Sequence, residues 1–200
     1  MIRTVAIRTL ALTLVLVMPA FAQDNTHKMS PQEQAMMEAY AKAGAPGPQH
    51  AQLASTAGQY DLVIKSWHAP GTPPETTTGS AERSMTLDGR VMVEKTRSTM
   101  MGQAFTGVGM HGYDNVSGKH WSTWNDSMST GLMVSEGTCD DHGACAFTGS
   151  WNDPITKGKI TARMTTRWTD KDTQIFEMFG PGPKGEEMKM MEITYNRRDD

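Results

Sequence analysis

The sequence has 200 residues, of which 38% are hydrophobic and 20% charged, and its formal net charge is −3 at pH 7. This is the composition of an ordinary globular chain, so it excludes an intrinsically disordered protein and a membrane protein with several spans. The length suits one domain.

The first 22 residues have the pattern of a secretory signal peptide. Arg3 and Arg8 precede an apolar run at residues 10–17, and residues 20–22 (Ala-Phe-Ala) provide the small residues that a signal peptidase recognises. The run is too short to span a bilayer core of about 30 Å, and no cysteine follows it to accept a lipid. We therefore expect cleavage near Ala22 and a periplasmic or secreted protein with no membrane span in its mature form. An uncleaved N-terminal anchor is the alternative.

The charges of the remaining chain argue against two classes of partner. Without Arg3 and Arg8, 17 Lys and Arg stand against 22 Asp and Glu, a net charge of −5, and the densest basic cluster is Arg197-Arg198. Binding to nucleic acid requires a concentrated basic face. We therefore expect no nucleic acid and no anionic membrane as partner.

Cys139 and Cys145 are the only cysteines. In an exported protein an even pair is most simply a disulfide, and five intervening residues fit a β-hairpin. A zinc or redox site would need further ligands or a Cys-x-x-Cys motif, so we expect no metal at these residues.

Residues 23–49 are predicted to hold a short helix and a linker. Ser30, Pro31 and Glu33 form an N-cap, a first-turn proline and a capping box, and the helix should end near Ala43 before the Gly-Ala-Pro-Gly-Pro sequence at 44–48. A docked lid, a surface arm and a mobile tether are all compatible with this pattern.

Residues 50–200 are predicted to form an all-β domain. About ten alternating segments are separated by turn residues, with an Asp88-Gly89 hairpin turn between the second and third. Short connections favour an antiparallel barrel over a sandwich. The predicted strands are 58–67, 77–87, 90–100, 104–113, 119–126, 131–139, 144–151, 159–168, 173–179 and 188–197.

Several motifs make the chain resemble the secreted bacterial family known as domain of unknown function 1579. They are Phe-x-Gly-x-Gly-x-x-Gly-Tyr-Asp at 105–114, Trp-x-Asp-Ser at 124–127, Gly137, and Lys-x-Met-Glu-Ile-Thr-Tyr-x-Arg at 189–197. The resemblance covers about residues 50–198 and implies a lipocalin-like barrel, but no established activity or cofactor. One departure is Tyr60, because lipocalin-like proteins commonly have Gly-x-Trp where this chain has Gly58-Gln59-Tyr60.

The lipocalin-like resemblance also implies a structural pair that closes one end of the barrel. In such barrels a basic side chain from the last strand covers the aromatic residue of the first. Here Arg197 would cover Tyr60 by a cation–π contact and by packing of its stem. Contact of Arg197 with a ligand is the alternative.

The densest group of polar and aromatic residues lies in the predicted hairpin 104–126. On alternate positions of a strand, His111 and Tyr113 share one face, as do His120, Trp124 and Asp126. We regard these five residues as candidate ligand contacts, and the alternative is that they serve barrel curvature and core packing. Whether both sets face the same side depends on strand register.

No catalytic motif occurs in the sequence, and no catalytic residue is proposed. The 17 methionines include Met1 and Met18, so 15 follow the signal peptide. Thioethers suit an adaptable apolar cavity and core packing, and they also bind Cu(I). We therefore expect a non-catalytic binder of a small apolar or amphipathic molecule. The alternatives are a periplasmic copper-binding protein, an envelope enzyme without a recognisable motif, and a partner-binding envelope protein.

Overall fold

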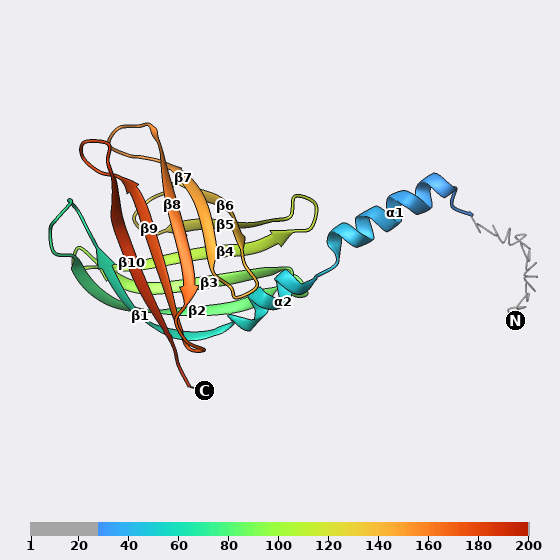
Figure 1. Ribbon diagram of the computed structural model, residues 1–200, viewed down its shortest axis with the longest axis horizontal. Coiled ribbons are helices and arrows are strands. Elements are labelled where there is room, and N and C mark those ends of the chain that lie inside the picture. The colour runs from blue at the N-terminus through green and yellow to red at the C-terminus, as the bar shows by residue number, and fades with distance from the viewer. Residues whose placement is uncertain (1–27, 200) are drawn as a thin grey trace, which may run out of the picture.

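The computed structural model describes residues 28–199, so the predicted signal peptide lies outside the described residues. Ten antiparallel strands form a closed barrel in which each strand pairs with the next along the chain and β1 pairs with β10 (Figure 1). The predicted all-β antiparallel barrel is confirmed. The elements are α1 (Pro31–Gly44), α2 (Pro48–Ser55), β1 (Gly58–Ser66), β2 (Glu75–Thr86), β3 (Val91–Met100), β4 (Gln103–Asp114), β5 (Lys119–Asp126), β6 (Met133–Cys139), β7 (Cys145–Asn152), β8 (Lys159–Trp168), β9 (Thr173–Pro181) and β10 (Glu187–Arg197).

Helix α1 projects from the barrel as an arm (Figure 1). Its capping box is formed as predicted, with the Ser30 amide 2.7 Å from the Glu33 carboxylate and the Glu33 amide 3.3 Å from the Ser30 hydroxyl. None of its residues is buried, and the apolar side chains of Met36 and Tyr40 are exposed. The structure therefore shows an arm rather than a docked lid. No helix in residues 28–199 has the length and apolar character needed to cross a membrane.

Helix α2 was not predicted, because the glycines and prolines at residues 44–48 are typical of a linker that leads directly into the first strand. Pro48 lies in its first turn, and His50 supplies the N-terminal cap by accepting a hydrogen bond of 3.0 Å from the Gly47 amide at Nδ1. His50 is buried, and its ring meets the edge of Tyr113 at a centroid distance of 5.9 Å. An eight-residue helix has little stability of its own, so its packing against the barrel stabilises it.

The barrel interior has a compact apolar part. Tyr60 and Leu62 alternate inward on β1, and they form a buried cluster with Ala81 and Tyr195. Methionines fill other parts of the interior: Met164 is buried, and its methyl group occupies the space that a Cβ at Gly149 would need. This contact is the core-packing use of methionine considered above.

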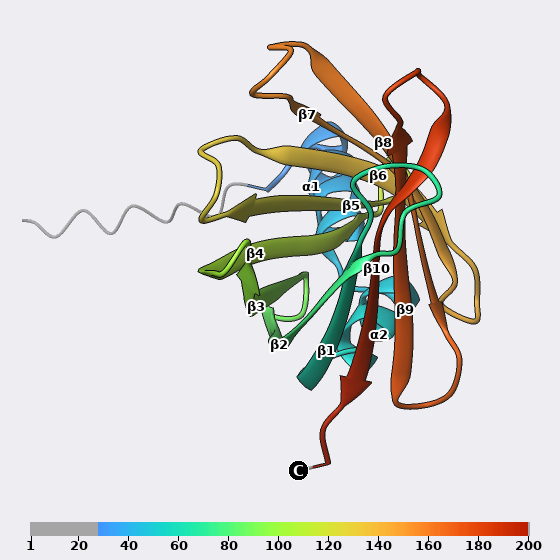
Figure 2. The ribbon, with the colours of Figure 1, turned by 90° about the vertical axis from the view of Figure 1, so that its left-hand side faces the viewer.

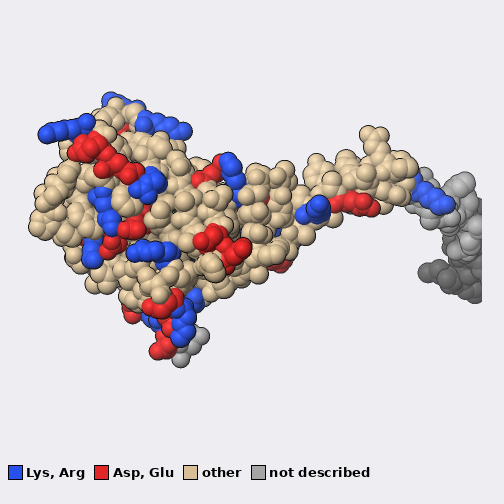
Figure 3. Space-filling model, viewed as in Figure 1, with Lys and Arg blue, Asp and Glu red and all other residues tan. Residues whose placement is uncertain are grey.

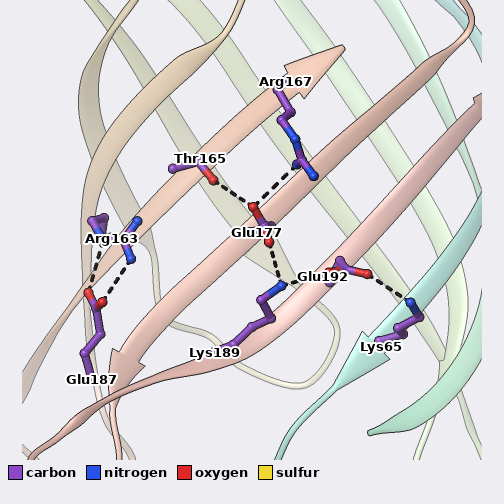
Figure 4. A network of polar contacts seen from close by, with 8 residues as sticks. All are labelled: Lys65, Arg163, Thr165, Arg167, Glu177, Glu187, Lys189 and Glu192. Carbon is purple, nitrogen blue, oxygen red and sulfur yellow. Dashed lines mark hydrogen bonds and ion pairs between the residues drawn. The ribbon is translucent and has the colours of Figure 1, made fainter. Parts of the chain in front are cut away.

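The outer face carries ion pairs over the strands where the barrel closes. Lys189 contacts Glu177 at 2.5 Å and Glu192 at 2.8 Å, and Glu192 continues to Lys65 on β1 at 3.0 Å (Figure 4). Lys65 and Glu192 are register partners, so this row crosses the β1–β10 seam. Figure 3 shows acidic and basic side chains interspersed on the face in view. Such partly exposed pairs each contribute little, but the connected network reinforces the closing strands.

Candidate binding site inside the barrel

A cavity of about 480 Å³ lies at the end of the barrel where β1 begins and β10 ends. Helix α2 lies at this end (Figure 2) and contributes Leu53 to the wall, and Thr56, directly after the helix, also borders the cavity. The β6–β7 loop, with Asp141 and His142, and the β8–β9 turn, with Asp170 and Lys171, add exposed residues to the wall. The site is therefore a concave space within the barrel, bordered by a short helix and two turns.

Apolar side chains form much of the wall. Met92 and Trp168 point inward from β3 and β8, and Phe147 does so from β7. Met92 also accepts a hydrogen bond of 3.0 Å at sulfur from the Thr56 hydroxyl, which attaches the end of α2 to the barrel. These surfaces can cover the apolar part of a bound molecule.

A buried polar network forms another part of the wall. Arg83 on β2 donates from Nε to Glu94 on β3 at 2.7 Å and from Nη1 to the side-chain oxygen of Gln174 on β9 at 2.7 Å. Glu94 also accepts hydrogen bonds from the hydroxyls of Tyr195 at 3.1 Å and Thr96 at 3.2 Å. Arg83 is held over the rings of Tyr60 and Tyr195, at 4.8 and 4.3 Å from their centroids. Because its members are bonded to one another, this network is rigid.

The protonation of the network follows from its contacts. Burial alone would raise the pKa of Glu94, but the charge and hydrogen bond of Arg83 outweigh burial and lower that pKa. Burial by itself would lower the pKa of Arg83, and the Glu94 carboxylate more than reverses this. Burial and the Glu94 charge raise the pKa of Tyr195. At neutral pH the site therefore contains an ion pair and a neutral tyrosine.

His111 and His120 both border this cavity, on β4 and β5. Burial lowers the pKa of His111, assisted by the charge of Arg83 and opposed by that of Glu94. Burial also lowers the pKa of His120, and His50 contributes to the effect. Within the described chain, the Nε2 atom of His111 is the buried side-chain nitrogen that has no hydrogen-bond partner. The two rings are therefore neutral at pH 7, and one has an unsatisfied nitrogen.

The register of β4 on β5 places both predicted sets of candidate residues on the interior face. His111 is opposite Ser122, and Tyr113 is opposite His120, with the rings of Tyr113 and His120 4.9 Å apart. His111 and His120 border the cavity, whereas Tyr113 lies beside it and packs between His120 and His50. The sequence could not decide this register, because a shift of one residue would have turned one set outward.

Trp124 and Asp126 pack further along the barrel and do not border the cavity. The Trp124 indole stacks on Phe105 at 6.5 Å and donates a hydrogen bond of 3.0 Å to Asp126. It occupies the space above Gly107, where a Cβ would lie 2.2 Å from the ring. Gly107 thus makes room for a bulky neighbour, and this neighbour is Trp124.

Arg197 lies over Tyr60, with its guanidinium carbon 5.0 Å from the ring centroid, and the two residues are register partners on β10 and β1. It also donates to the backbone oxygens of Ala57 and Ser55, at 2.5 and 3.0 Å, and borders the cavity. Arg197 therefore connects the last strand to the end of α2.

Cys139 and Cys145 form the expected disulfide across the β6–β7 hairpin, and both border the cavity. The hairpin turn contacts α2 through a hydrogen bond of 3.1 Å from the Gln52 side chain to the Asp140 carbonyl. Within residues 28–199, no group of three or more His, Cys, Asp and Glu side chains is arranged to hold a metal ion.

Sequence reasoning missed three residues of the site, namely Arg83, Glu94 and Gln174. A signal for the first two was present: Arg83 lies five positions before Asp88, and Glu94 lies five positions after Gly89. In a hairpin centred on those two turn residues, Arg83 and Glu94 are cross-strand partners, as the structure shows. Gln174 is 91 positions from Arg83 and carried no such signal.

The model of a family described as "Protein of unknown function (DUF1579)" matches residues 45–197, which include α2 and the whole barrel. A search of curated proteins finds no match.

Solved structures share the barrel at low sequence identity. The crystal structure of Rv2717c from M. tuberculosis is similar with a TM-score of 0.60 and 11% identity, covering 78% of this chain and 100% of that one. An S-type phycobiliprotein lyase, CPES from Guillardia theta, gives a TM-score of 0.53 and 10% identity, covering 80% and 97%. These likenesses support the fold.

Proposed function

The chain belongs to the DUF1579 family, whose description assigns no activity, and from the cavity we propose that it is a non-catalytic binding protein for a small amphipathic molecule. The observation that carries the proposal is one cavity of about 480 Å³ whose wall combines apolar side chains with a fixed polar network. Ligand pockets typically measure about 300–1,000 Å³ and have an apolar wall with a few fixed polar groups.

The two parts of the wall match the two parts of such a molecule. Leu53, Met92, Phe147 and Trp168 offer apolar surface for a hydrocarbon or ring portion. Arg83 and Gln174 offer polar groups that are fixed in position by hydrogen bonds to each other. A wholly apolar molecule would displace water from these polar groups without offering them a hydrogen bond, at a cost in free energy. An amphipathic molecule therefore fits better than an apolar one.

We propose that binding takes place in the periplasm or outside the cell. The support is the signal-peptide pattern at residues 1–22 together with the disulfide, which persists in oxidising compartments. Intact mass measurement of the protein exported from its own cells tests this proposal. A chain beginning at Gln23 is expected, and an uncleaved chain retained in the cytoplasm would refute it.

The binding proposal is tested with N-phenyl-1-naphthylamine, a neutral probe that fluoresces on entering an apolar site. Thr166 borders the cavity on β8, and a phenylalanine there would fill part of the space. Thr161 is on the same strand and exposed, so Thr161→Phe is the matched control.

Wild type and Thr161→Phe should bind the probe with equal affinity, and Thr166→Phe should weaken binding by tenfold or more, a loss of about 1.4 kcal/mol. Near-UV circular dichroism checks that both variants remain folded. Equal binding by Thr166→Phe, or no binding by wild type, would refute the proposed function.

A further inference from the structure

A histidine caps the N-terminus of α2, where another residue type is usual. The third residue of a helix often accepts a hydrogen bond from the backbone N–H of the N-cap residue, and Glu or Gln ordinarily has this role. In α2 the N-cap residue is Gly47 and the third residue is His50, whose Nδ1 atom accepts from the Gly47 amide at 3.0 Å. The cap therefore depends on a ring nitrogen that can take up a proton.

Protonation of His50 and formation of the cap exclude one another. A neutral imidazole has one donor and one acceptor nitrogen, whereas both nitrogens of a protonated ring are donors. Because Nδ1 accepts from Gly47, the neutral ring carries its hydrogen on Nε2. A proton added at Nδ1 would point a second donor at the Gly47 N–H, so the hydrogen bond of the cap would be lost.

His50 lies in a buried aromatic row. Its side chain is buried, the edge of its ring meets Tyr113 on β4 at a centroid distance of 5.9 Å, and Tyr113 meets His120 on β5 at 4.9 Å. His50 contributes to the lowered pKa of His120, so a charge on either histidine disfavours a charge on the other. A proton on His50 would thus enter a buried place beside a second histidine.

Among residues 28–199, the histidine that forms an ion pair with a carboxylate is His68, and His50 has no such partner. Helix α2 packs against β3 as well as β4, and Glu94, the buried acid of β3, is already paired with Arg83 at 2.7 Å. The charged side chain that contacts the linker before α2 is Arg90, which is a further cation. Protonation of His50 would therefore break the cap without forming an ion pair.

The cap affects the cavity through α2. The helix has eight residues, and Gln52 and Leu53 in its second turn border the cavity. Arg197 fixes the C-terminal end by donating to two backbone carbonyls there, and His50 fixes the N-terminal end. Such a short helix has little stability of its own. Loss of the cap would release the first turn and shift the side chains that follow it in the cavity wall.

Resting on the proposed binding function, we propose that His50 is a proton-sensitive positioning residue. While its ring is neutral, His50 caps α2 and holds Leu53 against the cavity. When its ring is protonated, the first turn of α2 is released and ligand binding weakens. His50 does not itself border the cavity, so it acts on the ligand through the helix.

The test measures the affinity of the mature protein for N-phenyl-1-naphthylamine at pH 8.0 and 5.5. This probe is neutral at both pH values, so its own charge does not change. Wild type should bind it at least fivefold more weakly at pH 5.5. His111 and His120 border the cavity and also respond to acid, so the effect of His50 is obtained from variants compared at the same pH.

Two substitutions of His50 and one matched control locate the effect. Gln is an ordinary capping residue and takes up no proton, so His50→Gln should bind like wild type at pH 8.0 and at least fivefold more tightly than wild type at pH 5.5. His50→Leu accepts no hydrogen bond and should bind at least fivefold more weakly than wild type at pH 8.0. The control is His142→Gln, because His142 is exposed and borders the same cavity, and it should follow wild type at both pH values.

Hydrogen exchange measures the cap directly. The backbone amides of Gly47 and of residues 50–53 are compared after correction for the intrinsic pH dependence of exchange. Their protection should decrease at least fivefold between pH 8.0 and 5.5 in wild type and should be retained in His50→Gln. Near-UV circular dichroism at both pH values checks that the barrel remains folded.

The outcomes separate this inference from the proposed function. If wild type and His50→Gln lose affinity and amide protection in parallel, or if His50→Leu binds as tightly as wild type at pH 8.0, the role of His50 is refuted and the binding function stands. If wild type fails to bind the probe at pH 8.0, the proposed function itself is wrong, and the inference falls with it.

Discussion

Arg83 and Glu94 are register partners on β2 and β3, and their side chains meet inside the barrel with Nε 2.7 Å from Oε2. A shift of this hairpin by one residue would turn one of the two side chains to the outside and leave the other charge buried alone. The pair therefore contributes to two properties at once: it specifies how β2 pairs with β3, and it places the polar wall of the cavity.

Glu94→Gln should destabilise the protein strongly. The substitution preserves shape but leaves the buried Arg83 charge without its carboxylate, and breaking a buried pair in this way costs about 3–5 kcal/mol. Urea denaturation followed by circular dichroism measures the change. The control is Glu82→Gln on the exposed side of β2, which should change stability by less than about 1 kcal/mol. Equal stability of Glu94→Gln and wild type would contradict the structural role of the pair.

Stability should decrease as the pH falls below the ordinary histidine pKa of 6.5. Burial lowers the pKa of His111 and of His120, so the unfolded chain binds protons at these residues before the folded chain does. Each of the two histidines then reduces the free energy of unfolding by up to about 1.4 kcal/mol per pH unit, until the pH reaches its own folded-state pKa.

Urea denaturation at intervals between pH 7 and 5 measures this slope, and His111→Gln/His120→Gln should flatten it. Glu94 affects stability in a lower pH range. Its pKa is depressed from 4.5, so the stability that its ionised form provides is lost only as the pH falls below 4.5 and through the folded-state pKa. A slope that is unchanged in the double variant would show that other groups control acid stability.

Gly107→Ala should disturb the packing of Trp124. The new methyl group would lie 2.2 Å from the indole, so the ring must move off its stack with Phe105. Overpacking of this kind costs about 1–3 kcal/mol. Thermal denaturation of Gly107→Ala, Trp124→Phe and the double variant forms a cycle, in which the smaller ring should recover part of the loss. Strictly additive effects would argue against this contact.

Removal of α1 should leave the barrel intact. No residue of α1 is buried, and its end contacts the barrel through exposed hydrogen bonds such as that from Arg90 to the Gly44 carbonyl at 2.9 Å. A chain that starts at Ala45 should lose less than about 1 kcal/mol of stability.

A chain that starts at Gly58 is the comparison for this truncation. It also lacks α2, and with it the hydrogen bond of 2.7 Å from Tyr60 to Thr56, so it should lose several kcal/mol. Urea denaturation of both truncated chains distinguishes them, and a large loss from removal of α1 alone would show a packing role that this structure does not contain.

The barrel could be predicted from sequence because its signals are local. Alternation at residues such as Tyr60 and Leu62 and turn residues such as Asp88-Gly89 specify strands and hairpins through the backbone geometry of a few neighbouring positions. The disulfide and the α1 capping box could be predicted for the same reason, because each depends on residues that are close together in the sequence. Helix α2 was missed because it depends on packing against the barrel rather than on strong local signals.

The candidate site depended on the tertiary structure. His111 and His120 were identified as candidates from composition and spacing alone, but only the β4–β5 register placed both inside, and only packing separated them from Trp124 and Asp126. Gln174 meets Arg83 because the barrel brings β9 and β2 within reach across its interior, 91 positions apart in the chain. A cavity is the volume that side chains from many strands leave unfilled, so no local pattern encodes it, whereas the strands that surround it follow from local patterns.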